Sequence, residues 1–140
     1  MTVTPLDAEQ IKARYDETSR LLRVTYFGDL AENTPALFYQ WLDHVDATIG
    51  IKNVRGVILD MRKMTKFHES NLSSTVKESR TMNREVDMSH LPVVFWVQNP
   101  YQEEIARILI KLTPQKNRRV LRHTEAEALA FIEDWHKAKA

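Results

Sequence analysis

Apolar and polar residues alternate near the N-terminus, and this alternation predicts a pair of strands. In the segment LLRVTYF, at about residues 21–27, the side chains of Leu22, Val24 and Tyr26 recur at every second position. A period of two is typical of a strand with one buried face. A polar turn at residues 16–19 separates this strand from an earlier one. We expect the two strands, which are close in sequence, to form an antiparallel hairpin.

Three further segments have the composition of strands. Residues 54–61 (VRGVILDM) and 91–98 (LPVVFWVQ) are short, apolar and rich in β-branched residues, which is typical of strands covered on both faces. A shorter strand is predicted at residues 118–122 (RRVLR). Because helices connect these three strands, we expect them to be parallel to one another.

Four other segments have the spacing or composition of helices. They cover residues 33–50, about 68–86, 99–112 and 124–136. Capping residues mark their starts, as at Asn99, which precedes a proline and a capping-box glutamine. The predicted core-facing residues are Phe38, Trp41, Leu42, Val45 and Ile49 in the first helix, a weak stripe of Leu72, Val76, Met82 and Val86 in the second, Ile105, Ile108, Leu109 and Leu112 in the third, and Ala128, Leu129, Ile132 and Trp135 in the fourth.

The predicted order β-β-α-β-α-β-α-β-α indicates an α/β fold, with residues 1–140 in a single domain. Right-handed crossovers and the N-terminal hairpin together give a mixed five-stranded sheet flanked by helices. If the strand order follows the chain order, all crossover helices lie on one face of the sheet. The opposite face would then be free to bind a partner.

Composition excludes several classes of site and leaves an ordinary globular domain. The absence of cysteine rules out disulfides, thiolate metal sites and cysteine nucleophiles, and it favours a cytoplasmic location. With only three glycines, the chain has no glycine-rich phosphate loop. A net charge of +1 gives no general attraction to nucleic acid. The N-terminus lacks a signal-peptide pattern, and no apolar run reaches the roughly 20 residues of a membrane span.

The strand LLRVTYFGDL, the closing segment RVLRHTEAEALAFIEDW and the element order resemble the SpoIIAA-like family. That family belongs to the STAS group of domains, named after sulfate transporters and anti-sigma factor antagonists. It shares its broad architecture with CRAL-TRIO lipid-binding domains. The resemblance covers about residues 10–136. It implies a STAS-like fold in a bacterial, cytoplasmic regulatory or ligand-binding module, and it leaves a homodimer open.

The stretch HESNL lies where anti-sigma factor antagonists carry a D-S-S-G-L motif, whose first serine takes a phosphate from a partner kinase. A gapless alignment places His68 at the aspartate and Glu69 at the phosphate-accepting serine. Ser70 then falls at the second serine, Asn71 at the glycine and Leu72 at the leucine. Glutamate has a permanent negative charge that suits a helix N-terminus but cannot be switched. The resemblance therefore argues against a kinase-controlled switch, and we expect Ser70 to cap the helix.

The candidate ligand- or partner-binding residues lie in and after the predicted strands, near the carboxyl ends at which open α/β sheets bind ligands. They are Asp60, His68, Glu69, Ser70, Trp96, Gln98 and Asn99. His68 and Glu69 could also form the acid–base pair of a small enzyme. Because no nucleophile or metal-ligand spacing accompanies them, a solvated turn is the simpler interpretation. The histidines show no metal-binding spacing, and we expect no metal and no cofactor.

Basic residues accumulate between residues 105 and 124, where no acidic residue occurs. A patch for phosphate, nucleic acid or anionic lipid would use Arg107, Lys111, Arg118, Arg119 and Arg122. Protection of a sheet edge and the dipole of the preceding helix would explain the same charges. No aromatic residue interleaves with them, as a single-strand binder would need, so nucleic acid is not favoured.

Methionines gather around the weakly patterned second helix. Met61, Met64, Met82 and Met88 suit an adaptable surface, because the flexible thioether side chain fills irregular gaps. A movable lid, an oligomer interface and an ordinary irregular helix all remain open. Trp96 belongs either to the core or to a lipophilic pocket between the sheet and the helices.

These patterns favour a non-catalytic STAS-like module that binds a protein partner or a small apolar or anionic ligand, without membrane insertion. A regulator of the anti-sigma-factor-antagonist type is the first alternative. A small enzyme that uses His68 and Glu69 is the second. No pattern in the chain identifies the ligand, the partner or the pathway.

Overall fold

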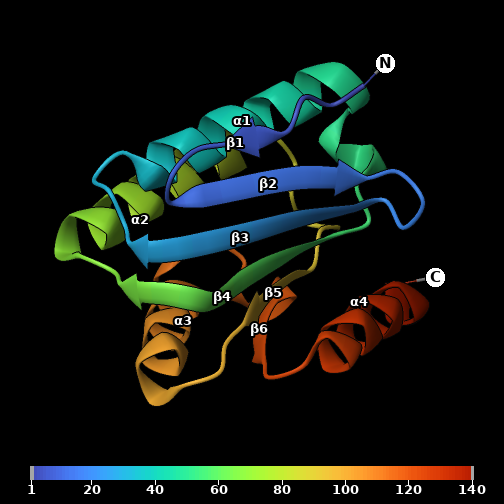
Figure 1. Ribbon diagram of the computed structural model, residues 1–140. Helices are drawn as coiled ribbons and strands as arrows, with labels where there is room; N and C mark the ends of the chain where they lie inside the picture. The colour runs from blue at the N-terminus through green and yellow to red at the C-terminus, as the bar shows by residue number, and fades with distance from the viewer. Residues whose placement is uncertain (1, 140) are drawn as a thin grey trace.

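The computed structural model describes residues 2–139 and shows helices arranged around one β-sheet (Figure 1). Within these residues the six strands are β1 (Leu6–Asp7), β2 (Ile11–Asp16), β3 (Leu21–Asp29), β4 (Gly56–Lys66), β5 (Val93–Trp96) and β6 (Arg119–Arg122). The helices of the same residues are α1 (Thr34–Ile49), α2 (Glu69–Glu85), α3 (Pro100–Leu112) and α4 (Glu125–Lys139), with 3₁₀ turns at Ile51–Asn53 and Lys116–Arg118.

The strands lie side by side in the order in which they occur in the chain. The pairs β1–β2 and β2–β3 are antiparallel, whereas the pairs β3–β4, β4–β5 and β5–β6 are parallel. The predicted hairpin and the three parallel strands are therefore confirmed. The prediction of five strands omitted β1. This edge strand pairs Leu6 with Ala13 and is only two residues long, too short to show an alternating pattern.

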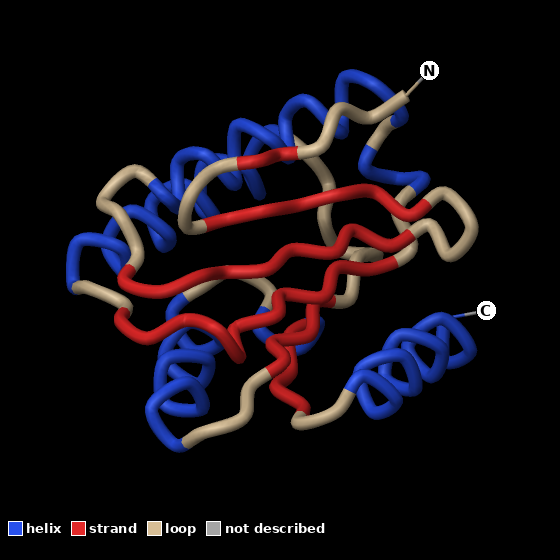
Figure 2. Tube along the Cα trace, viewed as in Figure 1, coloured by secondary structure: helices blue, strands red, loops and turns tan. Residues whose placement is uncertain are grey.

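Different helices cover the two faces of the sheet. Figure 2 shows the red strands running between α1 at the top and α4 at the lower right. The larger core lies between one face and the helices α1, α2 and α3. On the opposite face, Ala128 and Ile132 of α4 pack against Leu21, Ile58 and Val94. The expectation that this face is free is wrong where α4 lies, because the chain folds back across the sheet after its last strand.

β4 begins at Gly56, where α4 approaches the sheet closely. A Cβ atom at this position would lie 2.9 Å from Cδ1 of Ile132. A side chain larger than hydrogen would therefore push Ile132 away from the sheet. Gly56 thus sets the distance at which α4 packs.

The first helix follows the prediction closely. Proline occupies its first turn, and Gly50 ends it with φ of +80°, a conformation that favours glycine. Its predicted stripe is buried at Phe38, Trp41, Leu42 and Val45. The indole Nε1 of Trp41 also donates a hydrogen bond to Thr4 O at 2.8 Å. α1 therefore fixes one wall of the larger core.

The third helix is rotated relative to its predicted orientation. Its buried residues are Gln102, Ala106 and Leu109. Leu109 is thus confirmed as a core residue. Ile108 is only partly buried, and Leu112 is 42% exposed, so both were assigned to the wrong face.

The cause of this rotation is Gln102, a polar residue that the apolar pattern does not capture. Its Nε2 donates hydrogen bonds to Arg62 O at 3.2 Å and to Met64 O at 3.1 Å, both in β4. Its Oε1 accepts a hydrogen bond from Gln98 N at 2.9 Å. The predicted cap is confirmed, since Oδ1 of Asn99 accepts from Gln102 N at 2.9 Å. These bonds orient α3 against the sheet.

The start of the second helix also differs from the prediction. The N-cap residue is His68, and the backbone N–H of His68 donates to Oδ1 of Asn71 at 2.8 Å. Nδ2 of Asn71 donates to Ala31 O at 2.9 Å, and the Asn71 side chain is fully buried. Ser70 is an exposed residue inside the first turn. The prediction that Ser70 caps the helix is therefore wrong.

Candidate functional site

A cavity of about 70 Å³ lies in the larger core. Its wall is formed by the sheet, for example Leu59 of β4 and Phe95 of β5, by Phe38 of α1 and by Thr75 of α2. Protein interiors rarely contain voids much larger than a water molecule. This volume has room for about five water-sized groups. A mostly apolar cavity of this kind is a candidate binding site for a small molecule.

The four methionines noted in the sequence all line this cavity. Met61 and Met64 come from β4, Met82 from α2 and Met88 from the turn that follows α2. Each of them is at most 5% exposed. Because a thioether side chain has several rotatable bonds, these residues can fit ligands of different shape with little movement of the backbone.

α2 covers the cavity with few apolar contacts. Its buried residues are Asn71, Ser79 and Met82, of which two are polar. Leu72 and Val76, which were predicted to face the core, are only partly buried. The weak apolar stripe of this helix therefore reflects its position above a cavity.

Two arginine side chains at the start of β6 also line the cavity. Arg118 and Arg119 are only 1% and 8% exposed. Arg118 donates from Nη1 to Leu91 O at 3.0 Å and from Nε to Oε1 of Gln115 at 3.1 Å. Nη2 of Arg119 donates to Ser79 Oγ at 3.5 Å. The site thus combines an apolar wall with two buried guanidinium groups.

No carboxylate balances these two charges in the described part of the chain. Among residues 2–139, no Asp or Glu oxygen lies within 4.0 Å of either guanidinium group. Burial, and then the like charge of Arg119, lower the pKa of Arg118 to about 9, and burial also lowers the pKa of Arg119. The pKa of Arg118 lies above 7, and arginine side chains ordinarily carry a positive charge in proteins, so the cavity wall is positively charged.

Further polar groups line the same cavity. Burial raises the pKa of the Tyr39 hydroxyl, while a hydrogen bond with Ser79 and the charge of Arg119 oppose this rise. Thr34 Oγ1 and Asn83 Oδ1 are buried and find no hydrogen-bond partner within residues 2–139. Buried polar atoms ordinarily have a partner. These unpaired atoms therefore fit a site that is completed by water or a ligand.

The sequence interpretation missed this role of the arginines. Within β6, the strand period of two places Arg119 on the same face as Leu121, which packs against the larger core. This alternation could have indicated that Arg119 is buried. Arg118 precedes the strand, and no periodicity indicates its burial.

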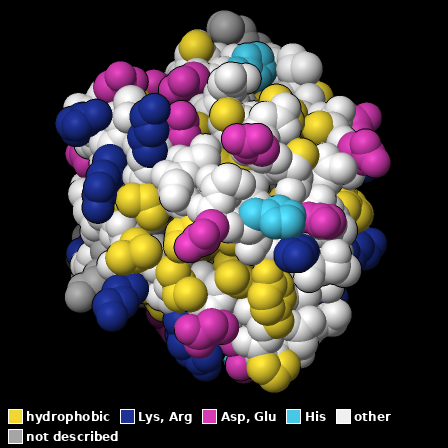
Figure 3. Space-filling model, turned by 90° about the vertical axis from the view of Figure 1, so that its left-hand side faces the viewer, with side chains coloured by type: hydrophobic (Ala, Val, Ile, Leu, Met, Phe, Trp, Pro, Cys, Tyr) yellow, Lys and Arg dark blue, Asp and Glu magenta, His cyan; other side chains and the backbone are white. Residues whose placement is uncertain are grey.

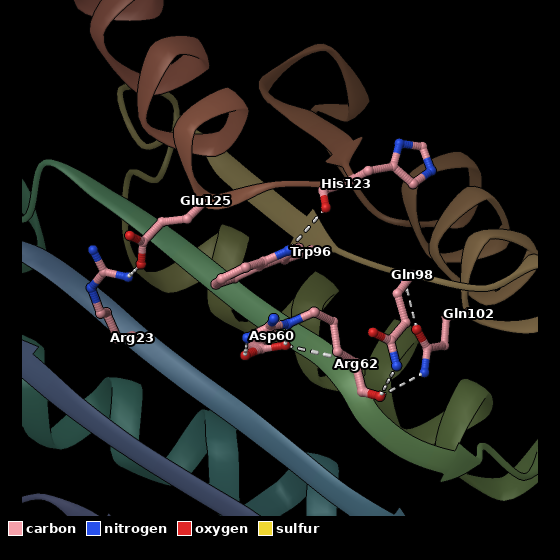
Figure 4. A network of polar contacts seen from close by, with 8 residues as sticks. All are labelled: Arg23, Asp60, Arg62, Trp96, Gln98, Gln102, His123 and Glu125. Atoms are coloured by element: carbon pink, nitrogen blue, oxygen red, sulfur yellow. Dashed lines mark hydrogen bonds and ion pairs between the residues drawn. The ribbon is translucent and has the colours of Figure 1, made fainter.

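The predicted residues Asp60, Trp96 and Gln98 come together around one arginine (Figure 4). Asp60 accepts hydrogen bonds from Nε and Nη2 of Arg62 at 3.0 and 2.9 Å. The guanidinium carbon of Arg62 lies 3.6 Å from the centroid of the Trp96 ring. Nε2 of Gln98 donates to Arg62 O at 3.0 Å. Arg62, which the sequence analysis did not select, is the centre of this group.

This network connects strands to α4 and lies apart from the cavity. The indole Nε1 of Trp96 donates to His123 O at 3.3 Å, and Nη1 of Arg23 contacts Oε2 of Glu125 at 2.8 Å. Trp96 packs with the smaller core beneath α4 and does not line the cavity. The hydrogen bonds that Arg62 donates to the Asp60 carboxylate raise the pKa of Arg62. Since these charges are paired within the protein, the network has the features of a structural contact that holds α4 against the sheet.

His68, Glu69 and Ser70 lie away from both features, at the start of α2. Nε2 of His68 contacts Oδ1 of Asp29, and Glu69 and Ser70 are exposed. Within residues 2–139, no hydrogen bond joins His68 to Glu69. The same residues contain no group of three or more potential metal ligands. The geometry thus does not bring His68 and Glu69 together as an acid–base pair.

The five predicted basic residues do not form one surface. Arg107 and Lys111 are exposed on α3, and Nη2 of Arg107 lies 3.8 Å from Oε2 of Glu103. The guanidinium carbon of Arg122 lies 5.4 Å from the centroid of the Phe131 ring on the α4 side of the sheet. The other two arginines line the cavity.

A shallow groove between α2 and α3 forms a separate surface feature. It is lined by Leu72, Ser73, Val76, Lys77, Arg80, Thr81, Arg84 and Leu112. Figure 3 shows one side of the molecule, on which hydrophobic side chains gather in the lower half and Lys and Arg side chains lie along the left edge.

No helix within residues 2–139 is long and apolar enough to cross a membrane.

Comparison with known proteins shows the fold. No family model and no curated protein matches the chain. Among solved structures, an uncharacterized protein of the DUF3478 family with a SpoIIAA-like fold, from Shewanella loihica PV-4, matches with a TM-score of 0.64. It is 15% identical, and the match covers 91% of this chain and 97% of that chain. The predicted SpoIIAA-like fold is therefore confirmed, and at this identity the likeness concerns the fold alone.

Proposed function

We propose that this SpoIIAA-like domain is a non-catalytic module that binds a small, largely apolar ligand in the cavity beneath α2. The observation that supports the proposal is the cavity itself, with its volume of about 70 Å³. Small-molecule sites are typically concave and mostly apolar, with a few polar groups that orient the ligand. This cavity has both features.

The polar groups of the cavity support binding better than catalysis. Burial raises the pKa of Tyr26 and of Tyr39, so both hydroxyls stay protonated at pH 7. The two arginines remain charged and cannot accept a proton. General acid–base catalysis needs a group whose pKa lies near the working pH. These four side chains therefore suit recognition of a ligand.

The experiment that tests the proposal is NMR of the protein with ¹³C-labelled methionine methyl groups, titrated with 1-hexanol. The methyl signals of Met61, Met64, Met82 and Met88 should shift together and saturably, because all four side chains line the cavity. Signals that stay unchanged at the solubility limit of 1-hexanol would contradict the proposal.

Two variants of α2 provide a matched comparison. Thr75 lines the cavity, whereas Thr81 lines the outer groove of the same helix. Each hydroxyl donates to the carbonyl four residues earlier, so the lost hydrogen bond is similar. Thr75→Leu should fill part of the cavity and weaken 1-hexanol binding by about tenfold or more. Steric overlap between the leucine and one or two carbon atoms of the ligand lowers the affinity by at least that factor. Thr81→Leu should bind as the unaltered protein does, and equal weakening in both variants would contradict the proposal.

The alternative function is a regulator of the anti-sigma-factor-antagonist type. The exposed start of α2 is the observation that favours this alternative. Ser70 and Ser73 are both exposed there, so a kinase could reach them. Glu69 nevertheless stands at the position of the acceptor serine. Intact-mass analysis of protein isolated from its native host should find no stoichiometric phosphate. A full phosphate on either serine, or on Ser74, would favour the regulator instead.

A further inference from the structure

We infer that the ligand carries a carboxylate, which Arg118 and Arg119 bind at the charged part of the cavity wall. This inference rests on the proposed binding function and specifies the chemical class of the ligand. It follows from the charges, the free hydrogen-bond donors and the size of the cavity.

Three partly exposed arginines of the chain are paired with carboxylates, whereas the two buried arginines are not. Arg23, Arg55 and Arg62 have side-chain exposures of 23%, 34% and 37%, and each contacts a carboxylate at 2.8 to 3.0 Å. Arg118 and Arg119 are far less exposed, yet no carboxylate of residues 2–139 approaches them. A buried charge without a counterion destabilises the folded state, and two adjacent like charges destabilise it further. An anionic ligand would supply the missing charge.

The guanidinium groups have N–H donors that are not all used by hydrogen bonds within the protein. A guanidinium group carries five N–H donors. Arg118 directs Nε and Nη1 to protein oxygens at 3.1 and 3.0 Å. Nη1 of Arg119 donates to Pro114 O and Gln115 O, whereas the bond from its Nη2 to Ser79 Oγ, at 3.5 Å, is long. A carboxylate could accept shorter, charge-assisted hydrogen bonds from the same groups, because its two oxygens match the planar fork of a guanidinium.

The rest of the cavity defines the tail of the ligand. The cavity has room for about five water-sized groups as it stands, so an unbranched chain of about six carbons fits only when the methionine side chains change rotamer. The wall beyond the arginines is apolar, as Phe38, Leu59 and Phe95 illustrate. A short-chain monocarboxylate therefore satisfies both parts of the cavity. A cationic ligand would meet two like charges.

The first test compares three probes of equal chain length on the unaltered protein at pH 7, by isothermal titration calorimetry. Hexanoate should bind at least about tenfold more tightly than 1-hexanol, the ratio expected when a charged acceptor replaces a neutral one at a buried donor. 1-Hexylamine should bind more weakly than 1-hexanol. Equal affinities for hexanoate and 1-hexanol would overturn the carboxylate inference but leave the binding function intact. Failure of all three probes to bind would overturn both.

The second test removes each charge in turn. Arg118→Gln and Arg119→Gln should each reduce the preference for hexanoate over 1-hexanol toward unity, with 1-hexanol affinity kept within about twofold. Arg107→Gln is the matched control, since Arg107 is exposed on α3 and outside the cavity. The methionine methyl spectrum verifies that each variant is folded. If a variant fails to fold, the probe comparison on the unaltered protein decides. A preference for hexanoate that persists in both folded variants would overturn the assignment to these arginines.

Discussion

At the scale of single residues, this chain buries polar side chains where backbone groups need partners. Asn71, Gln102 and Arg118 are at most 1% exposed. Each hydrogen-bonds to a backbone carbonyl that lies far away in the sequence. A sequence pattern cannot reveal such long-range pairs, so Ser70, a good capping residue by type, was expected to cap α2. The N-cap residue is His68, two residues before Ser70, and its backbone N–H donates to the buried amide of Asn71.

The start of α2 provides a prediction at this scale. Asn71→Ala should lower the free energy of unfolding by about 1–3 kcal/mol, because it leaves His68 N and Ala31 O without their partners. Ser70→Ala should change it by no more than about 0.5 kcal/mol, since the side chain is exposed. Urea unfolding of the two variants measures both values. Similar losses in the two variants would restore Ser70 as the cap.

The charge state of Arg118 gives a prediction about pH. Its pKa is lowered to about 9, chiefly by burial, so the group loses its charge as the pH rises through that value. We therefore expect hexanoate binding to be constant between about pH 6 and 8 and to weaken above about pH 9. At low pH, binding should weaken as hexanoate is protonated, at about pH 4–5. Calorimetry across this range, with 1-hexanol as the uncharged reference, tests the profile. A parallel decline of both probes at high pH would point to a general loss of structure.

The same shift has a consequence for the pH dependence of stability. The folded-state pKa of Arg118 is below the ordinary value of 12.5, so between those values the unfolded chain binds more protons. The contribution of this group to folding is therefore unfavourable below about pH 9 and is relieved as the pH rises above it. A bound carboxylate would remove part of this cost at neutral pH.

At the scale of elements, the helix α1 was predicted well, whereas α2, which lies above a cavity, and α3, which buries a polar residue, were not. α1 buries the stripe that its sequence predicts. α3 has a stripe of four apolar residues, but Gln102 orients the helix and turns Leu112 outward. α2 has a weak stripe because it lies above a cavity. The deviations in α2 and α3 thus have specific causes in hydrogen bonding and in cavity formation.

The orientation of α3 can be tested with two adjacent residues. Leu109 is 4% exposed and lines the cavity, whereas Ile108 is only partly buried. Leu109→Ala should lower the free energy of unfolding by about 2–5 kcal/mol. Ile108→Ala should cost clearly less, about 1 kcal/mol, because part of its side chain is already in water. Guanidinium unfolding measures the difference, and a larger cost at Ile108 would mean that the helix is turned the other way.

At the scale of the whole molecule, strand order and strand direction could be predicted, because the connections permit few arrangements. The position of α4 was missed, although a signal was present. Residues 54–61 were interpreted as a strand covered on both faces, and Ile58 indeed packs against α4 while Val57 and Leu59 face the larger core. A strand that is apolar on both faces needs a cover on both. That requirement excludes a sheet with one free face along its whole width.

The candidate site could be predicted only in part, for a reason that also concerns the whole molecule. The methionines were identified as a group, and they do surround one feature. The arginines were assigned to the surface, because charged residues are rarely buried without a partner. The two sets meet only in the folded chain, where β4, α2 and the start of β6 border the same cavity.

A crystal structure of the protein with hexanoate would show directly whether the cavity binds a carboxylate. We expect electron density for one hexanoate in the cavity beneath α2, with its tail against the methionines and its carboxylate within about 3 Å of the guanidinium nitrogens of Arg118 or Arg119. The methionine side chains should change rotamer while the strands stay in place. A cavity that holds only water at saturating hexanoate, or a hexanoate bound solely at another surface, would contradict it.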